Sequence, residues 1–207
     1  MSAVILVTGA TGQVGRHVVG MLCDAGAQVR ALVRPGEESP WRAGSDIEVF
    51  VADFEDVPGL EAAARGADRL FMLVPPHIRQ ERWQSNIVNA AASAGVDHVV
   101  KLSAFDTGER SRLNIGRWHH AGEQALLESG LRHTVLRPQY FVQNLLSSPM
   151  IAQEGVLPTF LSEAARVSMI DAADVAAAAC ALLMSADPTA HDRVQVPTGP
   201  AAVSVAE

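Results

Sequence analysis

Short apolar runs alternate with longer amphipathic stretches along most of the chain. The runs have the length and apolar content of buried strands, and they cover residues 3–7, 28–33, 47–52, 69–74, 96–102 and 133–136. Four of the stretches between them repeat apolar residues at helical spacing, over residues 14–25, 57–66, 78–94 and 113–129. This alternation predicts an α/β fold in which crossover helices cover a doubly wound, mostly parallel sheet.

The alternation changes after Pro138. Irregular connections follow at residues 147–149 and near Gly155 and Pro158, before a helical pattern over 171–186 and a strand-like run over 193–196. We therefore expect residues 1–138 to form the core. Residues 139–207 should form a small substrate-side lobe, integrated with that core in a single structural domain.

Composition narrows the classes of partner. The chain has 207 residues and a formal net charge of −7, which argues against nucleic acid or an anionic membrane as its main partner. No cluster of cysteines and histidines has the spacing of a metal site, so no metal is expected. Because no leader precedes the first strand and the longest apolar stretch, 175–184, is too short to cross a bilayer, we expect a cytoplasmic protein. A homodimer is left open.

A glycine-rich turn, TGATGQVG at residues 8–15, joins the first strand to the first helix. In such a turn Gly9 permits the tight bend, Gly12 lets the backbone approach phosphates, and Gly15 lets the helix pack closely. The unpaired N–H groups at the helix start would face a pyrophosphate with the positive end of the helix dipole. The turn therefore predicts a dinucleotide-binding Rossmann fold, with cofactor contacts from Gly9, Thr11, Gly12, Gln13, Val14 and Gly15.

The residue that ends the second strand indicates which dinucleotide binds. A carboxylate at that point would hold the ribose 2′-hydroxyl of NAD, whereas this chain has Arg34, whose guanidinium can hold the 2′-phosphate of NADP. Glu37 and Glu38 are interpreted as solvent-facing loop charges. Asp53 is placed to accept from the adenine amino group, or else to cap the next helix, for which Asp56 is better placed. The remaining expected cofactor contacts are Phe54, Leu73, Val74, Pro75 and Pro138.

Several of these segments together resemble one known group, the atypical short-chain dehydrogenase/reductases of the NmrA-like and quinone-oxidoreductase-like type. The resemblance covers essentially the whole chain and rests on residues 8–15, Arg34, Asp53, Leu102-Ser103, 123–138, Asn144 and 167–176. It implies an NADP(H)-binding protein that acts on a small molecule. It also implies that members continue past the point matching Thr198-Gly199-Pro200, into helices that complete the substrate pocket.

The catalytic pair of the wider superfamily is missing. Its reductases use a Tyr-x-x-x-Lys pair on the helix after the fifth strand, and the alignment puts Ile115 and His119 at those two places. The resemblance leaves Ser103, which would hydrogen-bond the reacting oxygen, and His119, which would bind the ribose or donate a proton. Each has a structural alternative, since Ser103 could end a strand and His119 could be a packing residue.

The substrate pocket should be bordered by residues that follow the sixth strand. Tyr140 and Phe141 come directly after Arg137-Pro138, and Asn144 resembles an asparagine typical of the branch. Asp171 and Asp174 are explained by capping and by the dipole of the helix they open.

The sequence supports two classes of function. The first is an NADPH-dependent oxidoreductase that transfers a hydride to a small apolar acceptor, a quinone or a conjugated carbonyl, without the usual pair. The second is a non-catalytic NmrA-like NADP-binding sensor, which the missing tyrosine favours. A sugar-nucleotide epimerase ranks last because its chemistry depends on that tyrosine.

Overall fold

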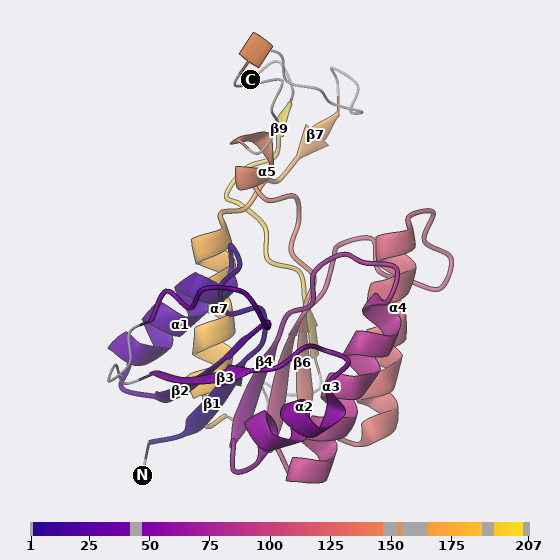
Figure 1. Ribbon diagram of the computed structural model, residues 1–207. Helices are drawn as coiled ribbons and strands as arrows, with labels where there is room; N and C mark the ends of the chain where they lie inside the picture. Colours follow the sequence, from indigo (N-terminus) through magenta and orange to yellow (C-terminus); the bar gives the residue numbers. More distant parts are fainter. Residues whose placement is uncertain (1, 42–46, 147–152, 155–164, 188–192, 205–207) are drawn as a thin grey trace.

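The computed structural model of the chain describes residues 2–41, 47–146, 153–154, 165–187 and 193–204. Seven strands form one sheet in the order β3-β2-β1-β4-β5-β6-β8, and every neighbouring pair is parallel (Figure 1). Their bounds are β1 Val4–Val7, β2 Gln28–Val33, β3 Ile47–Val51, β4 Arg69–Met72, β5 His98–Leu102, β6 His133–Leu136 and β8 Arg193–Gln195. The predicted Rossmann-type α/β fold is confirmed.

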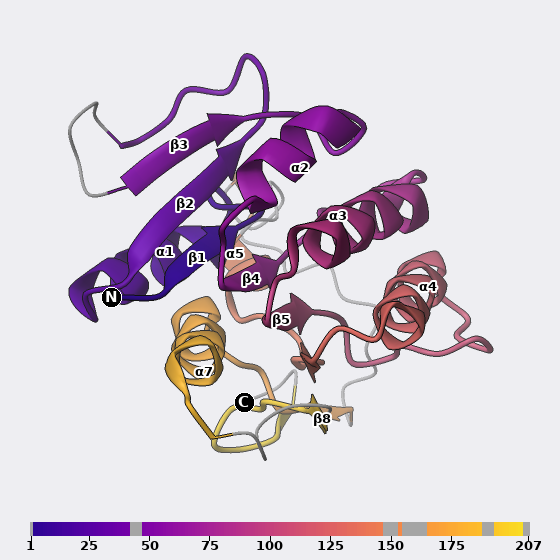
Figure 2. The same cartoon turned by 90° about the horizontal axis from the view of Figure 1, so that it is seen from below.

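Helices cover both faces of the sheet, as Figure 2 shows along the strands. One face is covered by α1 (Gly15–Asp24) and α7 (Ala172–Met184), and the other by α2 (Val57–Ala64), α3 (Gln80–Ala94) and α4 (Asn114–Ser129). A hydrophobic cluster lies under each set of helices, so the sheet is buried on both sides. The alanine-rich α7 packs closely beside α1, since Ala176 and Ala179 are fully buried and the Cys180 thiol lies 3.6 Å from the Val18 carbonyl oxygen.

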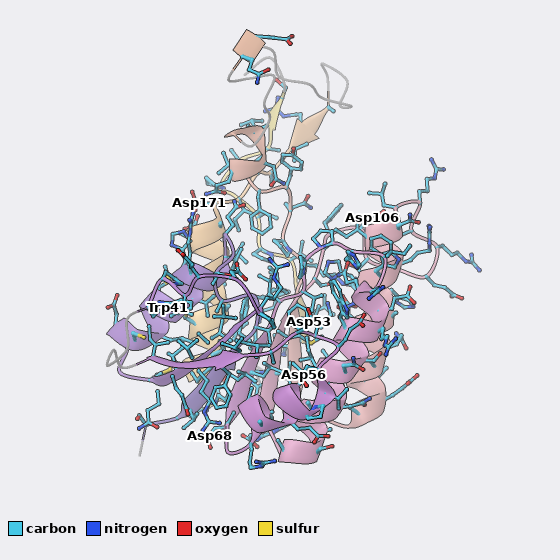
Figure 3. All side chains as sticks on the ribbon, viewed as in Figure 1. Trp41, Asp53, Asp56, Asp68, Asp106 and Asp171 are labelled. Carbon is cyan, nitrogen blue, oxygen red and sulfur yellow. The ribbon has the colours of Figure 1, made fainter. Side chains whose placement is uncertain are left out.

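The sequence signals at helix ends have the expected structural effect. The Asp56 carboxylate accepts from the Gly59 N–H at 3.1 Å and caps α2, and the Asp171 carboxylate accepts from the Ala173 N–H at 2.7 Å and caps α7 (Figure 3). Gly95 and Gly130 end α3 and α4 in the left-handed conformation. The predicted strand and helix bounds agree with these elements to within one or two residues at each end.

The segment after Pro138 divides between the core and the carboxyl edge of the sheet. Helix α7 and strand β8 return to the core. The short elements α5 (Gln143–Leu146), β7 (Arg166–Val167) and β9 (Val203–Ser204) lie beyond the carboxyl ends of the strands, where β7 and β9 pair antiparallel (Figure 1). The sequence did not predict these three elements, because two to four residues are too few to show a period. The division into residues 1–138 and 139–207 stays a prediction.

Candidate functional site

A pocket opens at the carboxyl ends of the first four strands, where the strand order reverses between β1 and β4. Ligands of open α/β sheets bind at this switch point. The cavity has a volume of about 150 Å³. We call it the strand-end pocket, and its lining residues are Gly9, Thr11, Gly12, Leu32, Arg34, Glu37, Ala52, Phe54, Leu73 and Pro75.

The glycine-rich turn has the backbone that the sequence predicted. Gly9 has φ +63°, a conformation that side chains rarely tolerate, and its carbonyl oxygen accepts from the Gly12 N–H at 3.0 Å. A Cβ atom on Gly15 would overlap the Gly9 carbonyl oxygen, so the close approach of α1 to the turn requires glycine there. A Cβ atom on Gly12 would lie 3.2 Å from the Gly9 carbonyl oxygen, a tight contact that also favours glycine at this position.

The turn also presents donors that fit an anionic group such as a pyrophosphate. Val14, the N-cap residue of α1, makes no side-chain capping hydrogen bond. The buried Gln13 Nε2 has no hydrogen-bond partner among the residues that the structure describes. Because a buried amide without a partner is costly, a ligand acceptor at this point would stabilise the protein.

The wall of the pocket at the end of β2 carries both signs of charge. Thr11 Oγ1 donates to Glu37 Oε1 at 2.8 Å, and Arg34 Nε lies 3.4 Å from Glu37 Oε2. The Thr11 hydroxyl, followed by Arg34, lowers the pKa of the Glu37 carboxyl, so this group is ionised at neutral pH. The interpretation of Glu37 as a solvent-facing charge is wrong, because the loop folds it back over the glycine-rich turn. Glu38 is exposed, as expected.

The other expected cofactor residues fall into two groups. Phe54, Leu73 and Pro75 line the pocket. Asp53 does not line it, and its carboxylate accepts from the Glu55 N–H at 2.9 Å (Figure 3). Gln13, Val14, Gly15, Val74 and Pro138 are also absent from the lining, so cofactor contacts from these residues stay predictions.

Two apolar lining residues were missed. Leu32 lies near the carboxyl end of β2, and Ala52 directly follows β3. Their positions at the carboxyl ends of strands were the sequence signal that could have placed them in the pocket.

A second polar group lies deeper, between β5 and helices α3 and α4. We call it the buried polar network, and its members are Gln80, Lys101, Ser103, His119, Glu123 and Arg137. Ser103 Oγ donates to Glu123 Oε1 at 2.5 Å, and Arg137 holds the same carboxylate with Nε at 3.1 Å and Nη2 at 2.5 Å. Ser103 and Glu123 are 6% and 8% exposed. The predicted catalytic hydroxyl is therefore engaged inside the protein.

The imidazole of His119 is also engaged. Lys101 Nζ lies 3.0 Å from His119 Nδ1, and when Lys101 is protonated its ammonium group donates to Nδ1, so that Nε2 carries the ring hydrogen. The Gln80 amide nitrogen lies 3.3 Å from that Nε2, while the buried Gln80 Oε1 has no partner among the described residues. Turning the amide by 180° would place its oxygen where it can accept from Nε2.

Burial controls the charges in this network. It lowers the pKa of Lys101 to about 7, against the opposing attraction of Glu123. Burial and the nearby Lys101 charge lower the pKa of His119 to about 2, so the imidazole is neutral at pH 7. As a proton donor, His119 would have to act from its neutral form. The catalytic roles of Ser103 and His119 stay predictions.

Lys101 was missed as a site residue. It is the only lysine in the chain, and it lies between Val100 and Leu102 in a buried strand. A charged residue inside a buried strand needs a partner, and this was the signal that could have identified it.

The expected substrate-pocket residues follow β6 near the carboxyl edge. Tyr140 is 36% exposed, Asn144 is exposed, and Phe141 bridges to Ile170 and packs against the core. Ile115, at the place of the superfamily tyrosine, lies half-buried in the first turn of α4. Contacts of these residues with a substrate stay predictions.

The described part of the chain has neither a metal cluster nor a membrane-spanning helix. No group of three or more histidine, cysteine, aspartate or glutamate side chains there is arranged to hold a metal ion. None of the helices there has the length and apolar content needed to cross a membrane.

The fold and the strand-end pocket define a dinucleotide-binding protein of the Rossmann class. More specifically, the NmrA-like family matches residues 1–204, and the chain belongs to that family. This confirms the resemblance inferred from the motifs.

Several of the named relatives are reductases. The chain is 40% identical over 208 residues to a (4-alkanoyl-5-oxo-2,5-dihydrofuran-3-yl)methyl phosphate reductase of Streptomyces griseus, covering 98% of this chain and 70% of that protein. It is 34% identical over 205 residues to an NAD(P)H azoreductase of Xenophilus azovorans, with the same two coverages. Among solved structures, the NADPH-dependent quinone oxidoreductase of Escherichia coli complexed with NADPH aligns with a TM-score of 0.83 and 29% identity, over 97% of this chain and 71% of that one.

Proposed function

We propose that this protein is an NADPH-dependent reductase that transfers a hydride to a small apolar acceptor, a quinone or a conjugated carbonyl. The observation that carries the proposal is the strand-end pocket, in which the glycine-rich turn, Thr11 and Arg34 meet at the switch point of the sheet. Relatives named as NAD(P)H-dependent reductases support the same class of activity.

When bound, NADPH supplies the hydride, and the residues of this chain bind and orient the reactants. The turn around Gly9 and Gly12 would hold the diphosphate, and Gln13 Nε2 would gain the acceptor that it lacks. Arg34 and Thr11 would hold the 2′-phosphate, since charge-assisted hydrogen bonds to phosphate are the strong ones. Phe54, Leu73 and Pro75 supply an apolar wall for the adenosine.

The proposed class of hydride acceptor is based on the absence of a dedicated proton donor among the expected catalytic residues. Ile115 cannot protonate a substrate oxygen, and His119 is neutral and engaged. A quinone or conjugated carbonyl suits such a site, because the charge on its reduced oxygen is delocalised and solvent can complete the protonation. Within the proposal, Ser103 donates to the acceptor oxygen by turning its hydroxyl hydrogen away from Glu123. The catalytic contribution of the protein as a whole is to orient the reactants and to exclude water.

A second candidate function is a non-catalytic dinucleotide sensor. The observation that favours it is the closed state of the buried polar network, in which both expected catalytic side chains are satisfied internally. A sensor would bind NADPH through the same strand-end pocket and would leave the network unchanged.

One experiment separates the two functions. We would measure NADPH and NADH binding by titration calorimetry, then follow the absorbance of the reduced nicotinamide with a panel of quinones and enones. The reductase proposal expects turnover well above the buffer rate and a large loss of kcat in Ser103→Ala with an unchanged NADPH Kd. Tight binding without turnover on any acceptor would favour the sensor. Failure to bind either coenzyme would overturn both.

A further inference from the structure

An ionised carboxylate stands inside a pocket whose other polar groups are suited to an anion. The side chain of Glu37 is 31% exposed, lines the strand-end pocket and accepts from Thr11, a residue of the glycine-rich turn. The neighbouring Glu38 is exposed and has no place in that pocket. Two adjacent glutamates therefore differ in environment, and only one of them belongs to the site.

The backbone of the loop after β2 explains why Glu37 returns to the turn. The Glu37 N–H donates to the Arg34 carbonyl oxygen at 3.1 Å, and Gly36 has φ +80°. This tight bend directs Glu37 back toward Arg34 and Thr11, at distances of 3.4 Å and 2.8 Å. Glu37 is thus held by the two side chains that would hold a 2′-phosphate.

A carboxylate and a phosphate compete for these donors. Both are anions that accept hydrogen bonds, and the single hydroxyl hydrogen of Thr11 cannot serve both well. Placing them side by side would also bring like charges together in a partly enclosed pocket, which costs binding free energy. A ribose 2′-hydroxyl makes the opposite demand, because it is neutral and can donate to the carboxylate.

We propose that Glu37 is a specificity-determining residue that occupies the place of the adenosine 2′-phosphate, weakens NADPH binding and supports NADH binding. The proposal rests on the proposed function, because it assumes that the strand-end pocket holds the adenosine half of a nicotinamide coenzyme. NADPH displaces Glu37 from Arg34 and Thr11. NADH leaves the carboxylate in place and donates to it from the 2′-hydroxyl. The site then accepts both coenzymes, with a smaller preference for NADPH than Arg34 alone would give.

The test compares Glu37→Gln with the matched control Glu38→Gln, by calorimetric titration of the full chain with NADPH and with NADH. Both variants remove one negative charge from the same exposed loop. For Glu37→Gln we expect the ratio of the NADH Kd to the NADPH Kd to rise about tenfold, since like-charge repulsion is removed. The rise should shrink between low salt and about 0.5 M salt, because salt screens the repulsion. Glu38→Gln should change the ratio by less than about twofold, because exposed charges are well screened.

The outcomes distinguish this proposal from the proposed function. If wild-type protein binds NADPH and Glu37→Gln leaves the ratio unchanged, or changes it no more than Glu38→Gln does, the role of Glu37 is refuted and the reductase proposal stands. If wild-type protein binds neither coenzyme, both are refuted. Glu37→Ser, which keeps a small acceptor and removes the charge, is the second variant and should shift the ratio in the same direction.

Discussion

The strand-end pocket and the buried polar network lie at the same edge of one sheet, yet they use polar groups in opposite ways. In the pocket, Arg34 and Thr11 contact Glu37, and the Arg34 and Glu37 side chains stay 59% and 31% exposed, where a ligand can reach them. In the network, Ser103, Glu123 and Arg137 satisfy one another at distances of 2.5–3.1 Å. The first region is arranged to receive a ligand, whereas the Ser103–Glu123–Arg137 cluster of the second is satisfied internally.

The difference shows where binding and stability are separated in this fold. Exposed charged and polar groups contribute little to the free energy of unfolding, and their main effect is on the binding of an anion. A buried charge cluster, by contrast, contributes to stability only while every member is present. Substitutions in the pocket should therefore change coenzyme affinity with little effect on unfolding. Substitutions in the network should change unfolding first.

The largest expected effect is that of Glu123→Ala. The variant leaves the buried Lys101 and the half-buried Arg137 without their carboxylate, so we expect the free energy of unfolding to fall by about 3–5 kcal/mol. Urea unfolding monitored by circular dichroism measures this. Glu128→Ala, an exposed position on the same helix α4, is the control and should change stability by less than about 0.5 kcal/mol. Equal effects of the two variants would contradict the charge network.

The second effect concerns a substitution in the strand-end pocket and its consequence for coenzyme affinity. Arg34→Asp should raise the NADPH Kd by roughly ten- to a hundredfold, because one charge-assisted contact is lost and a repulsive charge is added. Stability should change little, since the Arg34 side chain is 59% exposed.

The control for this substitution is Arg65→Asp, which makes the same charge change at an exposed position outside the pocket. Calorimetry with NADPH and NADH should show a loss for NADPH in Arg34→Asp alone. A similar loss for both coenzymes, or in both variants, would remove Arg34 as the 2′-phosphate ligand.

A third expected effect is a dependence of stability on pH through Lys101. Its pKa is about 7 in the folded protein, whereas an unfolded lysine titrates near 10.4. Between these values the unfolded chain binds more protons, so the contribution of Lys101 to stability rises with pH, by at most about 1.4 kcal/mol per pH unit. The difference in unfolding free energy between wild type and Lys101→Met should therefore shift in favour of wild type from pH 7 to pH 9.5.

The titration of Lys101 can also be observed directly. Because the chain has a single lysine, labelling with ¹³Cε-lysine gives one side-chain resonance in nuclear magnetic resonance spectra. Its midpoint should lie near pH 7. A midpoint near the ordinary value would show that the amine is solvated and that the network is more open than described.

Most of the fold could be predicted from the chain because its elements are set by local patterns. Apolar runs such as 28–33 and 133–136 match β2 and β6 in full, and Asp56 and Asp171 cap the helices that they precede. The backbone of the glycine-rich turn followed from three glycines between a strand and a helix. The elements α5, β7 and β9 were missed because each is too short to carry a pattern.

The site divides in the same way. The sequence by itself determined the turn that can hold a diphosphate and the guanidinium at the end of β2, because both depend on neighbouring residues. Only the tertiary structure decided that Glu37 meets Thr11, 26 residues away, and that Lys101 reaches His119, 18 residues away. Such contacts depend on how loops fold over the sheet and how helices pack against it. The periodicity of the sequence does not predict these contacts, because they form between residues that come together only when the chain is packed.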